Sequence, residues 1–179
     1  MKFLEVLRQT PRDFDIEKEI TDILRRDFAI CDYREFVSYL DRADKILFIG
    51  DNAGECVFDS ILIEEMNKPT VYVVRDIPVI NDATYDDAVK AGIDRVATII
   101  SSGTKSPGTV LKTCSAQFRA LYDNSSFIIS KGQGNYEALS NEKRPLFFLL
   151  KAKCHVIAEH IGVEDGGIVL KGINVKETH

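Results

Sequence analysis

Apolar runs alternate along the chain with amphipathic segments, and each run ends in a polar or glycine-rich turn. The first run, from Lys45 to Ile49, precedes Gly50 and an amphipathic helix expected from about Glu55 to Met66. Similar runs predict further strands at residues 70–74, 95–100, 126–130, 146–150 and 167–171. Strands that alternate with helices are typical of an α/β protein. We therefore expect a three-layer α/β/α architecture around a largely parallel, doubly wound, Rossmann-like sheet.

The residues before the first run predict a short helical lead-in. A Thr-Pro pair favours a helix over 10–27, and the capping-box spacing of Asp32 and Glu35 predicts a second helix to about Arg42. Three later helices are expected: a short one after Asn81-Asp82, one opening near Thr109, and one ending near His160. The expected division is a helical lead-in, 1–44, and an α/β domain, 45–179.

Polar residues follow the ends of five of these strands. Parallel strands bring their carboxyl ends to one edge of a sheet, where doubly wound proteins bind ligands. The residues expected at this edge are Asp51, Asn52, Asp82, Ser101, Lys131 and Lys151. Carboxylate and amide oxygens suit a hard divalent cation, and lysines suit a phosphate group. The pattern therefore predicts a site for metal and phosphate.

The acidic residues also have a simpler explanation. Asp51 or Asn52 would be a favourable N-cap for the helix that follows, and Asp82 is well placed as the N-cap of the next one. One helix cap needs only one side chain, whereas Asp51, Asn52 and Glu55 all stand near the start of this helix. Taken singly, each residue fits a cap as well as a ligand. Taken together on one edge, they favour metal binding.

Two lysines at strand ends are candidates for holding an anion. Lys131 precedes Gly132 and Gly134, which would let backbone N–H groups approach a phosphate closely. A lysine in such a place commonly extends to solvent instead. Lys151 ends an unusually apolar strand, which favours a functional position for it.

Composition limits the classes of function. With 179 residues, 45% hydrophobic and 28% charged, the chain suits one α/β domain with a real core. A net charge of −5 without a Lys/Arg run argues against non-specific nucleic-acid binding. The four cysteines form no C-x-x-C pair and are expected to be reduced. No apolar run reaches the roughly 20 residues of a membrane helix, and the amino terminus is unlike a signal peptide, so we expect a cytoplasmic protein without a membrane partner.

Several enzyme motifs are absent from the sequence. GQGNYE lacks the third glycine of a dinucleotide fingerprint, and GTKSPGT lacks the Lys-Ser/Thr of a P-loop. Ala53 stands where a haloacid-type phosphatase needs a second aspartate. His155 and His160 do not share a helical face, and no G-x-S-x-G is present, which argues against a histidine metal site and a serine hydrolase.

Four motifs in order, GDNAGE-x-x-x-D, VRDIPVINDAT-x-x-DA, SKGQGN-x-E and FFLLKAKC, resemble those of the metal-dependent damage-control phosphatases and their ARMT1-like branch. The resemblance covers about Lys45 to Leu170. It implies a divalent cation, such as manganese, nickel, cobalt or magnesium, and hydrolysis of phosphomonoesters of small metabolites, such as sugar phosphates or damaged phosphometabolites. The implied metal ligands and catalytic residues are Asp51, Asn52 and Asp82. The implied substrate-binding residues are Glu55, Ser101, Lys131, Gly132, Gly134, Asn135 and Lys151.

The chain departs from this family in one respect. The family's members carry a longer helical lobe ahead of the GDNAGE strand, whereas about 44 residues precede Lys45 here. A pocket with fewer walls would have a different substrate preference. Apolar surface left exposed would favour self-association into a homo-oligomer.

The residues leave the mechanism and the class of protein open. Either a water or a carboxylate, Asp51 or Asp82, could attack phosphorus. A non-catalytic module that binds metal and a phosphometabolite is the main alternative to a phosphatase. An S-adenosylmethionine-dependent carboxyl methyltransferase is a further alternative, although the glycine-rich loop usual after its first strand is absent.

Overall fold

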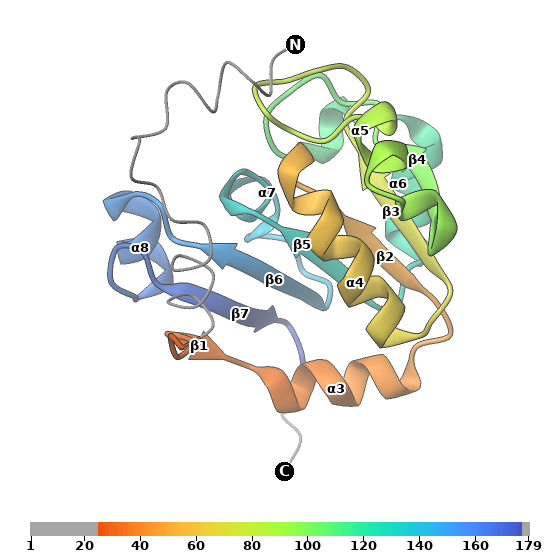
Figure 1. The fold of residues 1–179 in the computed structure, drawn as a ribbon. Helices are drawn as coiled ribbons and strands as arrows, with labels where there is room; N and C mark the ends of the chain where they lie inside the picture. Colours follow the sequence, from red (N-terminus) through yellow and green to blue (C-terminus); the bar gives the residue numbers. More distant parts are fainter. Residues whose placement is uncertain (1–24, 177–179) are drawn as a thin grey trace.

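The computed structural model describes residues 25–176, which form one sheet with helices on both faces (Figure 1). Within these residues the sheet has seven strands in the order β1-β7-β6-β5-β2-β3-β4. The strands are β1 (Ile30–Cys31), β2 (Ile46–Ile49), β3 (Thr70–Val74), β4 (Thr98–Ser101), β5 (Ile128–Lys131), β6 (Leu146–Lys151) and β7 (Ile168–Ile173). Neighbouring strands are parallel except β6 and β7, which are antiparallel. The prediction of a largely parallel sheet is confirmed.

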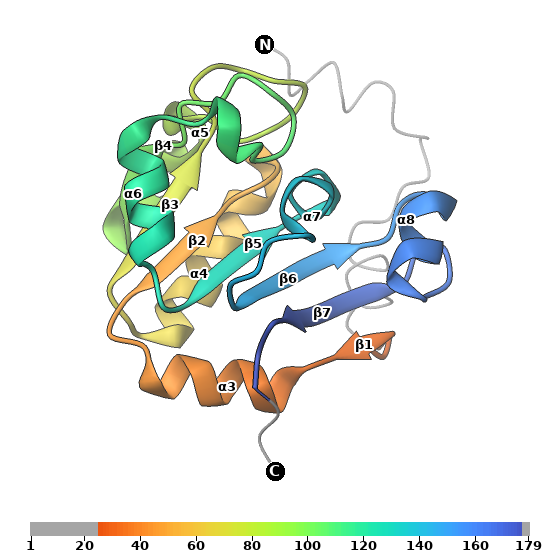
Figure 2. The ribbon, with the colours of Figure 1, turned by 180° about the vertical axis from the view of Figure 1, so that it is seen from behind.

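The helices form the two outer layers. They are α3 (Tyr33–Arg42), α4 (Cys56–Met66), α5 (Tyr85–Lys90), α6 (Ala116–Asn124), α7 (Gln133–Leu139) and α8 (His155–Ile161), with 3₁₀ turns η1 (Ala53–Glu55), η2 (Ile93–Arg95) and η3 (Leu111–Thr113). Figure 1 shows α3, α4 and α5 in front of the sheet, and Figure 2 shows α6, α7 and α8 on the opposite face. The predicted three-layer α/β/α architecture is confirmed.

The apolar runs fill a core on each face of the sheet. In β2, Ile46 and Phe48 pack with residues of α3 and α4, whereas Leu47 and Ile49 pack with residues of α6, α7 and α8. All four side chains are at most 1% exposed. A strand that is buried on both faces needs apolar residues at every position, which is why it reads as a continuous run.

The order of the strands reverses beside β2. The chain passes from β2 to β3 and β4 on one side, and then returns to place β5 on the other side of β2. Since these strands are parallel, the loops that follow β2 and β5 leave in opposite directions at their carboxyl ends. Such a switch point is where open α/β sheets bind ligands. Asp51 follows β2 there, and Lys131 ends β5.

Some local predictions were wrong. The helix expected near Thr109 begins later, at α6, where the hydroxyl of Ser115 accepts a hydrogen bond from the amide of Phe118. Asp32 makes no side-chain capping bond to α3, because its Oδ2 accepts a hydrogen bond from Gly172 N, at 2.7 Å. β1 and α7 were not predicted.

Two expectations about the first part of the chain remain predictions. The helix expected over 10–27 lies almost entirely outside the described residues. The division of the chain after residue 44 is also untested, although β1 adds a strand to the sheet from within the proposed lead-in. No helix in 25–176 is long and apolar enough to cross a membrane.

Candidate active site

The loop after β2 brings the expected metal ligands to one place. The carbonyl oxygen of Asp51 accepts a hydrogen bond from Ala83 N, at 2.7 Å, which joins this loop to the segment that follows β3. Asn52 Nδ2 donates to Asp51 Oδ2 at 3.0 Å and to Glu55 Oε1 at 2.7 Å. An isolated β-bridge pairs Asn52 with Asp82. Asp51, Asn52 and Asp82 therefore lie together, as expected for residues at one edge of the sheet.

Helix capping does not account for these residues. Neither η1 nor α4 has a side-chain hydrogen bond at its N-terminus. α5 begins after Thr84, whose hydroxyl accepts a hydrogen bond from the amide of Asp87. Asn52 stands at the N-cap position of η1, but no side chain of Asp51, Asn52 or Asp82 makes a capping hydrogen bond to η1, α4 or α5.

The surroundings of Asp51 disfavour its negative charge. Burial, followed by the nearby carboxylates of Glu55 and Asp82, raises the pKa of Asp51 to about 6. The positive charges of Arg75 and Lys153 act in the opposite direction but are outweighed. A bound cation would relieve this repulsion among carboxylates.

The donor atoms fit a hard divalent cation. Asp51, Asn52 and Asp82 offer carboxylate and amide oxygens, which magnesium and manganese prefer. Within residues 25–176, no three His, Cys, Asp or Glu side chains form a group that could hold a metal ion by themselves. The amide oxygen of Asn52 would therefore be part of the ligand set, with other oxygen atoms completing it.

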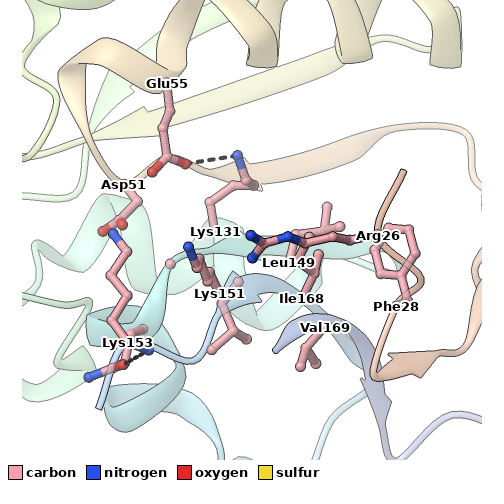
Figure 3. A pocket seen from close by; sticks show the side chains of 13 residues that line it. Arg26, Phe28, Asp51, Glu55, Lys131, Leu149, Lys151, Lys153, Ile168 and Val169 are labelled. Atoms are coloured by element: carbon pink, nitrogen blue, oxygen red, sulfur yellow. Dashed lines mark hydrogen bonds and ion pairs between the residues drawn. The ribbon is translucent and has the colours of Figure 1, made fainter. Parts of the chain in front are cut away.

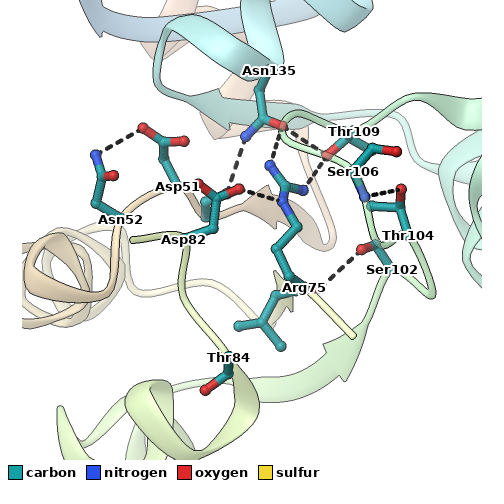
Figure 4. A network of polar contacts seen from close by, with 12 residues as sticks. Asp51, Asn52, Arg75, Asp82, Thr84, Ser102, Thr104, Ser106, Thr109 and Asn135 are labelled. Atoms are coloured by element: carbon teal, nitrogen blue, oxygen red, sulfur yellow. Dashed lines mark hydrogen bonds and ion pairs between the residues drawn. The ribbon is translucent and has the colours of Figure 1, made fainter. Parts of the chain in front are cut away.

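Asp82 differs from Asp51 because an arginine balances its charge. Arg75 Nε donates to Asp82 Oδ2 at 2.6 Å, and the two side chains are 2% and 8% exposed. The other guanidinium nitrogens donate to Thr109 Oγ1 and Asn135 Oδ1, both at 2.8 Å (Figure 4). Arg75 thus ties the segment after β3 to the loop before α6 and to α7.

Asn135 belongs to this network, and the expectation that it binds substrate is corrected. The side chain is fully buried. Its Nδ2 donates to the carbonyl oxygens of Gly50 and Lys131, at 3.0 and 2.8 Å, while Oδ1 accepts from Arg75 and Thr109. With both its N–H groups and its oxygen occupied by the protein, Asn135 supports the ends of β2 and β5.

Lys131 is held between two carboxylates. Its Nζ donates to Glu55 Oε2 at 3.0 Å and to Asp59 Oδ1 at 2.8 Å. Asp59 is 1% exposed and also accepts a hydrogen bond from the hydroxyl of Tyr72, at 2.8 Å. Burial works against the ammonium charge of Lys131, but Asp59 and Glu55 raise its pKa above the ordinary value. Lys131 is therefore charged at neutral pH.

The Glu55 carboxylate is also fixed in its charged form. Burial works against the charge, yet the Lys131 ammonium and the Asn52 amide hold the pKa of Glu55 below its ordinary value. Burial raises the pKa of Asp59, with Lys131 and Tyr72 opposing it. The result is a fixed ion-pair network beside the Asp51 loop.

A cavity of about 360 Å³ opens beside Asp51 and Glu55 (Figure 3). Its charged lining residues are Arg26, Asp51, Glu55, Lys131, Lys151 and Lys153. Its apolar lining residues are Phe28, Leu149, Leu150, Ile168 and Val169. The volume suits a small molecule, and the charges suit an anionic one.

Gly132 lets the cavity wall approach Asp51 closely. Its φ of +83° lies in the region that favours glycine, and a Cβ at this position would overlap the Asp51 carboxylate. The N–H of Gly132 donates to the carbonyl oxygen of Leu149, at 2.9 Å. The expectation that this N–H group binds a phosphate is therefore wrong, and the glycine is needed for space instead.

Two other expected residues lie away from the cavity. Ser101 Oγ donates to Asp76 Oδ1 and accepts from the amide of Gly103, both at 3.0 Å. Gly134 packs in α7 against Gly108. Neither lines the cavity, so substrate contact by Ser101 and Gly134 stays a prediction. The expected residues that do line it are Glu55, Lys131, Gly132 and Lys151.

Three functional candidates were missed, although all stand inside the quoted motifs. Arg75 follows an apolar strand directly, which is an unusual place for a buried charge. Asp59 is the final residue of GDNAGE-x-x-x-D, and Lys153 follows Lys151 at an interval of two in FFLLKAKC. Lys153 is near enough to Asp51 and Glu55 to lower both of their pKa values.

Comparisons with known proteins show the family to which the chain is similar. The sequence model of the damage-control phosphatase ARMT1-like domain matches residues 5–169. A damage-control phosphatase of Pyrococcus horikoshii is 42% identical over 161 residues, which are 87% of this chain and 56% of that protein. A damage-control phosphatase of Archaeoglobus fulgidus is 34% identical over 165 residues, 87% of this chain and 57% of that protein.

A solved structure supports the same relationship. The crystal structure of a DUF89 family protein from Pyrococcus horikoshii superimposes with a TM-score of 0.81 at 40% sequence identity. The match covers 87% of this chain and 56% of that one. The chain thus spans little more than half the length of the relatives that it matches.

Proposed function

The chain belongs to the damage-control phosphatase ARMT1-like family, and from this premise we propose that it hydrolyses phosphomonoesters of small metabolites with the help of a divalent cation. The observation that carries the proposal is the position of Asp51. It lies with Asn52 and Asp82 at the switch point of the sheet, and it faces a cavity lined by three lysines. Oxygen ligands beside a cationic cavity suit a metal-assisted phosphatase.

Residues of this chain would hold both the cation and the phosphate. Asp51, Asn52 and Asp82 would bind the cation, which when bound supplies Lewis-acid stabilisation of charge on the phosphoryl oxygens. Lys153 would bind phosphate oxygens from the cavity side, and Lys151 lines the part of the same cavity that the rest of the substrate would occupy. Lys131 lines the same cavity, but its positive charge is already paired with Glu55 and Asp59.

The two carboxylates that could assist the attack on phosphorus differ in access. Asp51 lines the cavity, whereas Asp82 does not line it and is paired with Arg75. A substrate in the cavity would therefore meet Asp51, either directly or through a water that Asp51 positions. The buried network around Arg75 keeps the strand ends in register and does not itself meet the substrate.

The test is phosphate release from a panel of small phosphomonoesters with manganese, nickel, cobalt or magnesium, and with chelator. We expect release that requires a cation and that is lost in Asp51→Ala. Release that persists in chelator would contradict the metal requirement. A Lys153→Gln variant should mainly raise KM, because it removes a phosphate contact.

The alternative of a non-catalytic binding module makes a different prediction in the same assay. Such a module would bind phosphate esters in the presence of a cation without releasing phosphate. Transfer of a methyl group from S-adenosylmethionine would instead indicate a methyltransferase. Calorimetry and phosphate detection on the same samples separate these outcomes.

A further inference from the structure

We propose that the preferred substrate carries a second anionic group, on the part of the molecule that remains after the phosphate is released, and that Arg26 and Lys151 bind this group. The inference rests on the proposed function and deepens it by naming a substrate class: phosphomonoesters of small acids. It follows from the distribution of charge around the cavity.

The charge of Lys131 is already balanced within the protein. Its ammonium group donates to Glu55 Oε2 and Asp59 Oδ1, at 3.0 and 2.8 Å, and the lysine side chain is only 16% exposed. Glu55 and Asp59 together carry more negative charge than Lys131 neutralises. These three residues therefore offer no surplus of positive charge to an anion.

Three further cations line the same cavity: Arg26, Lys151 and Lys153. None of them forms an ion pair with another of the residues 25–176. Among residues 25–176, Asp51 is the only other acidic residue in the lining. A divalent cation held by the Asp51 loop would increase the positive surplus further, so the cavity carries more positive charge than one phosphate dianion balances.

The three cations occupy different parts of the cavity. Lys153 points toward the Asp51 carboxylate, where the phosphate is expected (Figure 3). Lys151 and Arg26 extend on the side of β6 and β7, beside Leu149 and Ile168 (Figure 3). Lys151 and Ile168 are direct partners in the strand register.

This placement suits a second anion at a short distance from the first. Lys151 and Arg26 are exposed beside the apolar side chains of Leu149 and Ile168, so a ligand that enters the cavity can reach both cations. A guanidinium group can bind a carboxylate or phosphate through two hydrogen bonds. A cavity of about 360 Å³ leaves room for a compact molecule with two charged ends.

The experiment compares glycerol 3-phosphate with 3-phosphoglycerate, which differ by the replacement of a hydroxymethyl group with a carboxylate. The full chain is assayed with manganese, and kcat/KM is measured for both esters. We expect kcat/KM to be about tenfold higher for 3-phosphoglycerate, as one well-placed charge-assisted contact would give. Arg26→Gln and Lys151→Gln should each bring the ratio of the two values toward one.

A matched control is Lys90→Gln, because Lys90 is an exposed lysine in α5 that does not line the cavity. This variant should keep the wild-type ratio. The proposal is overturned if the wild type treats the two esters alike, or if both cavity variants keep the preference for 3-phosphoglycerate. In either case the proposed phosphatase function stands.

Failure of the proposed function gives a different result. If neither ester releases phosphate with any cation, the chain is not a phosphatase for this class of compound. Calorimetric binding of the two esters then tests the second-anion site alone. Tighter binding of 3-phosphoglycerate that is lost in Arg26→Gln supports the site, and equal binding of both esters overturns it.

Discussion

Two groups of charged side chains share one edge of the sheet and differ in how completely their charges are satisfied. Arg75 and Asp82 are almost fully buried, and each guanidinium nitrogen of Arg75 donates a hydrogen bond to Asp82, Thr109 or Asn135. Asp51 faces a cavity, and its pKa is raised to about 6 by burial and by neighbouring carboxylates. The protein therefore neutralises the negative charge of Asp82 with Arg75, but it does not neutralise that of Asp51.

The difference shows how one edge can provide both a rigid frame and a reactive site. Removing a member of the Arg75 network leaves a buried polar group without its partner, so the cost falls on stability. Changing Asp51 removes an unfavourable charge, so the cost falls on activity. Unfavourable charge is common at functional sites because binding or catalysis requires it.

The largest expected effect is on the stability of Arg75→Met. Asp82 would then be a buried carboxylate without its partner, and such losses cost about 3–5 kcal/mol. Chemical unfolding should show this decrease. Arg95→Met changes an exposed arginine and should alter the free energy of unfolding by no more than about 0.5 kcal/mol. A loss below about 1 kcal/mol for Arg75→Met would show that the Arg75 network contributes little to the stability of the fold.

Asp51→Asn should have the largest effect on activity. It keeps the shape of the side chain but removes a charge that the cation requires, and we expect kcat to fall by about 10²–10³. Steady-state phosphate release measures this loss. Asp44→Asn removes an exposed carboxylate elsewhere and should keep wild-type activity. Near-wild-type turnover in Asp51→Asn would remove Asp51 from the mechanism.

Gly132→Ala should affect both properties to an intermediate extent. The new methyl group would overlap the Asp51 carboxylate in a backbone conformation with φ +83°, and we expect a loss of about 1–3 kcal/mol together with most of the activity. Gly162 has a similar φ of +85° but nothing within 4 Å of an added Cβ. Gly162→Ala should therefore lose some stability and keep its activity. Equal loss of activity in the two variants would assign the effect to strain alone.

The smallest expected effect is the dependence of stability on pH. The folded-state pKa of Asp51, about 6, lies above the ordinary value of 3.8, so the folded protein binds this proton more tightly than the unfolded chain does. The resulting stability is fully present below about pH 4 and is lost as pH rises through 6. Between pH 4 and 7, the free energy of unfolding of the wild type should therefore fall by about 1–2 kcal/mol relative to that of Asp51→Asn. Urea unfolding in chelator, at several pH values, measures this difference, and a constant difference would contradict the raised pKa.

Much of the fold could be predicted because its central strands are buried on both faces. Strands β2 to β6 appear in the sequence as apolar runs that end in polar turns, so both the sheet and the meeting of Asp51, Asn52 and Asp82 at one edge were predicted. α7 was missed because Gly132 and Gly134 are poor helix formers. In the structure, Gly132 stands at the N-cap position of that helix with a positive φ.

The division of roles within the site could not be predicted. Arg75 and Asn135 are 60 positions apart, and their contact depends on how β3 and β5 are placed on either side of β2. A local pattern cannot distinguish a polar side chain that points into a cavity from one that is satisfied within the protein. For that reason Asn135 and Ser101 were expected at the substrate, and Lys153 was not.

The most direct test of the central claim is a calorimetric titration of the metal-stripped protein with manganese at pH 7.5. If Asp51 is part of a cation site, the wild type and Asp44→Asn bind one ion per chain, whereas Asp51→Asn binds manganese far more weakly. Equal binding by the wild type and Asp51→Asn would contradict the claim, because the cation would then lie elsewhere or not be required.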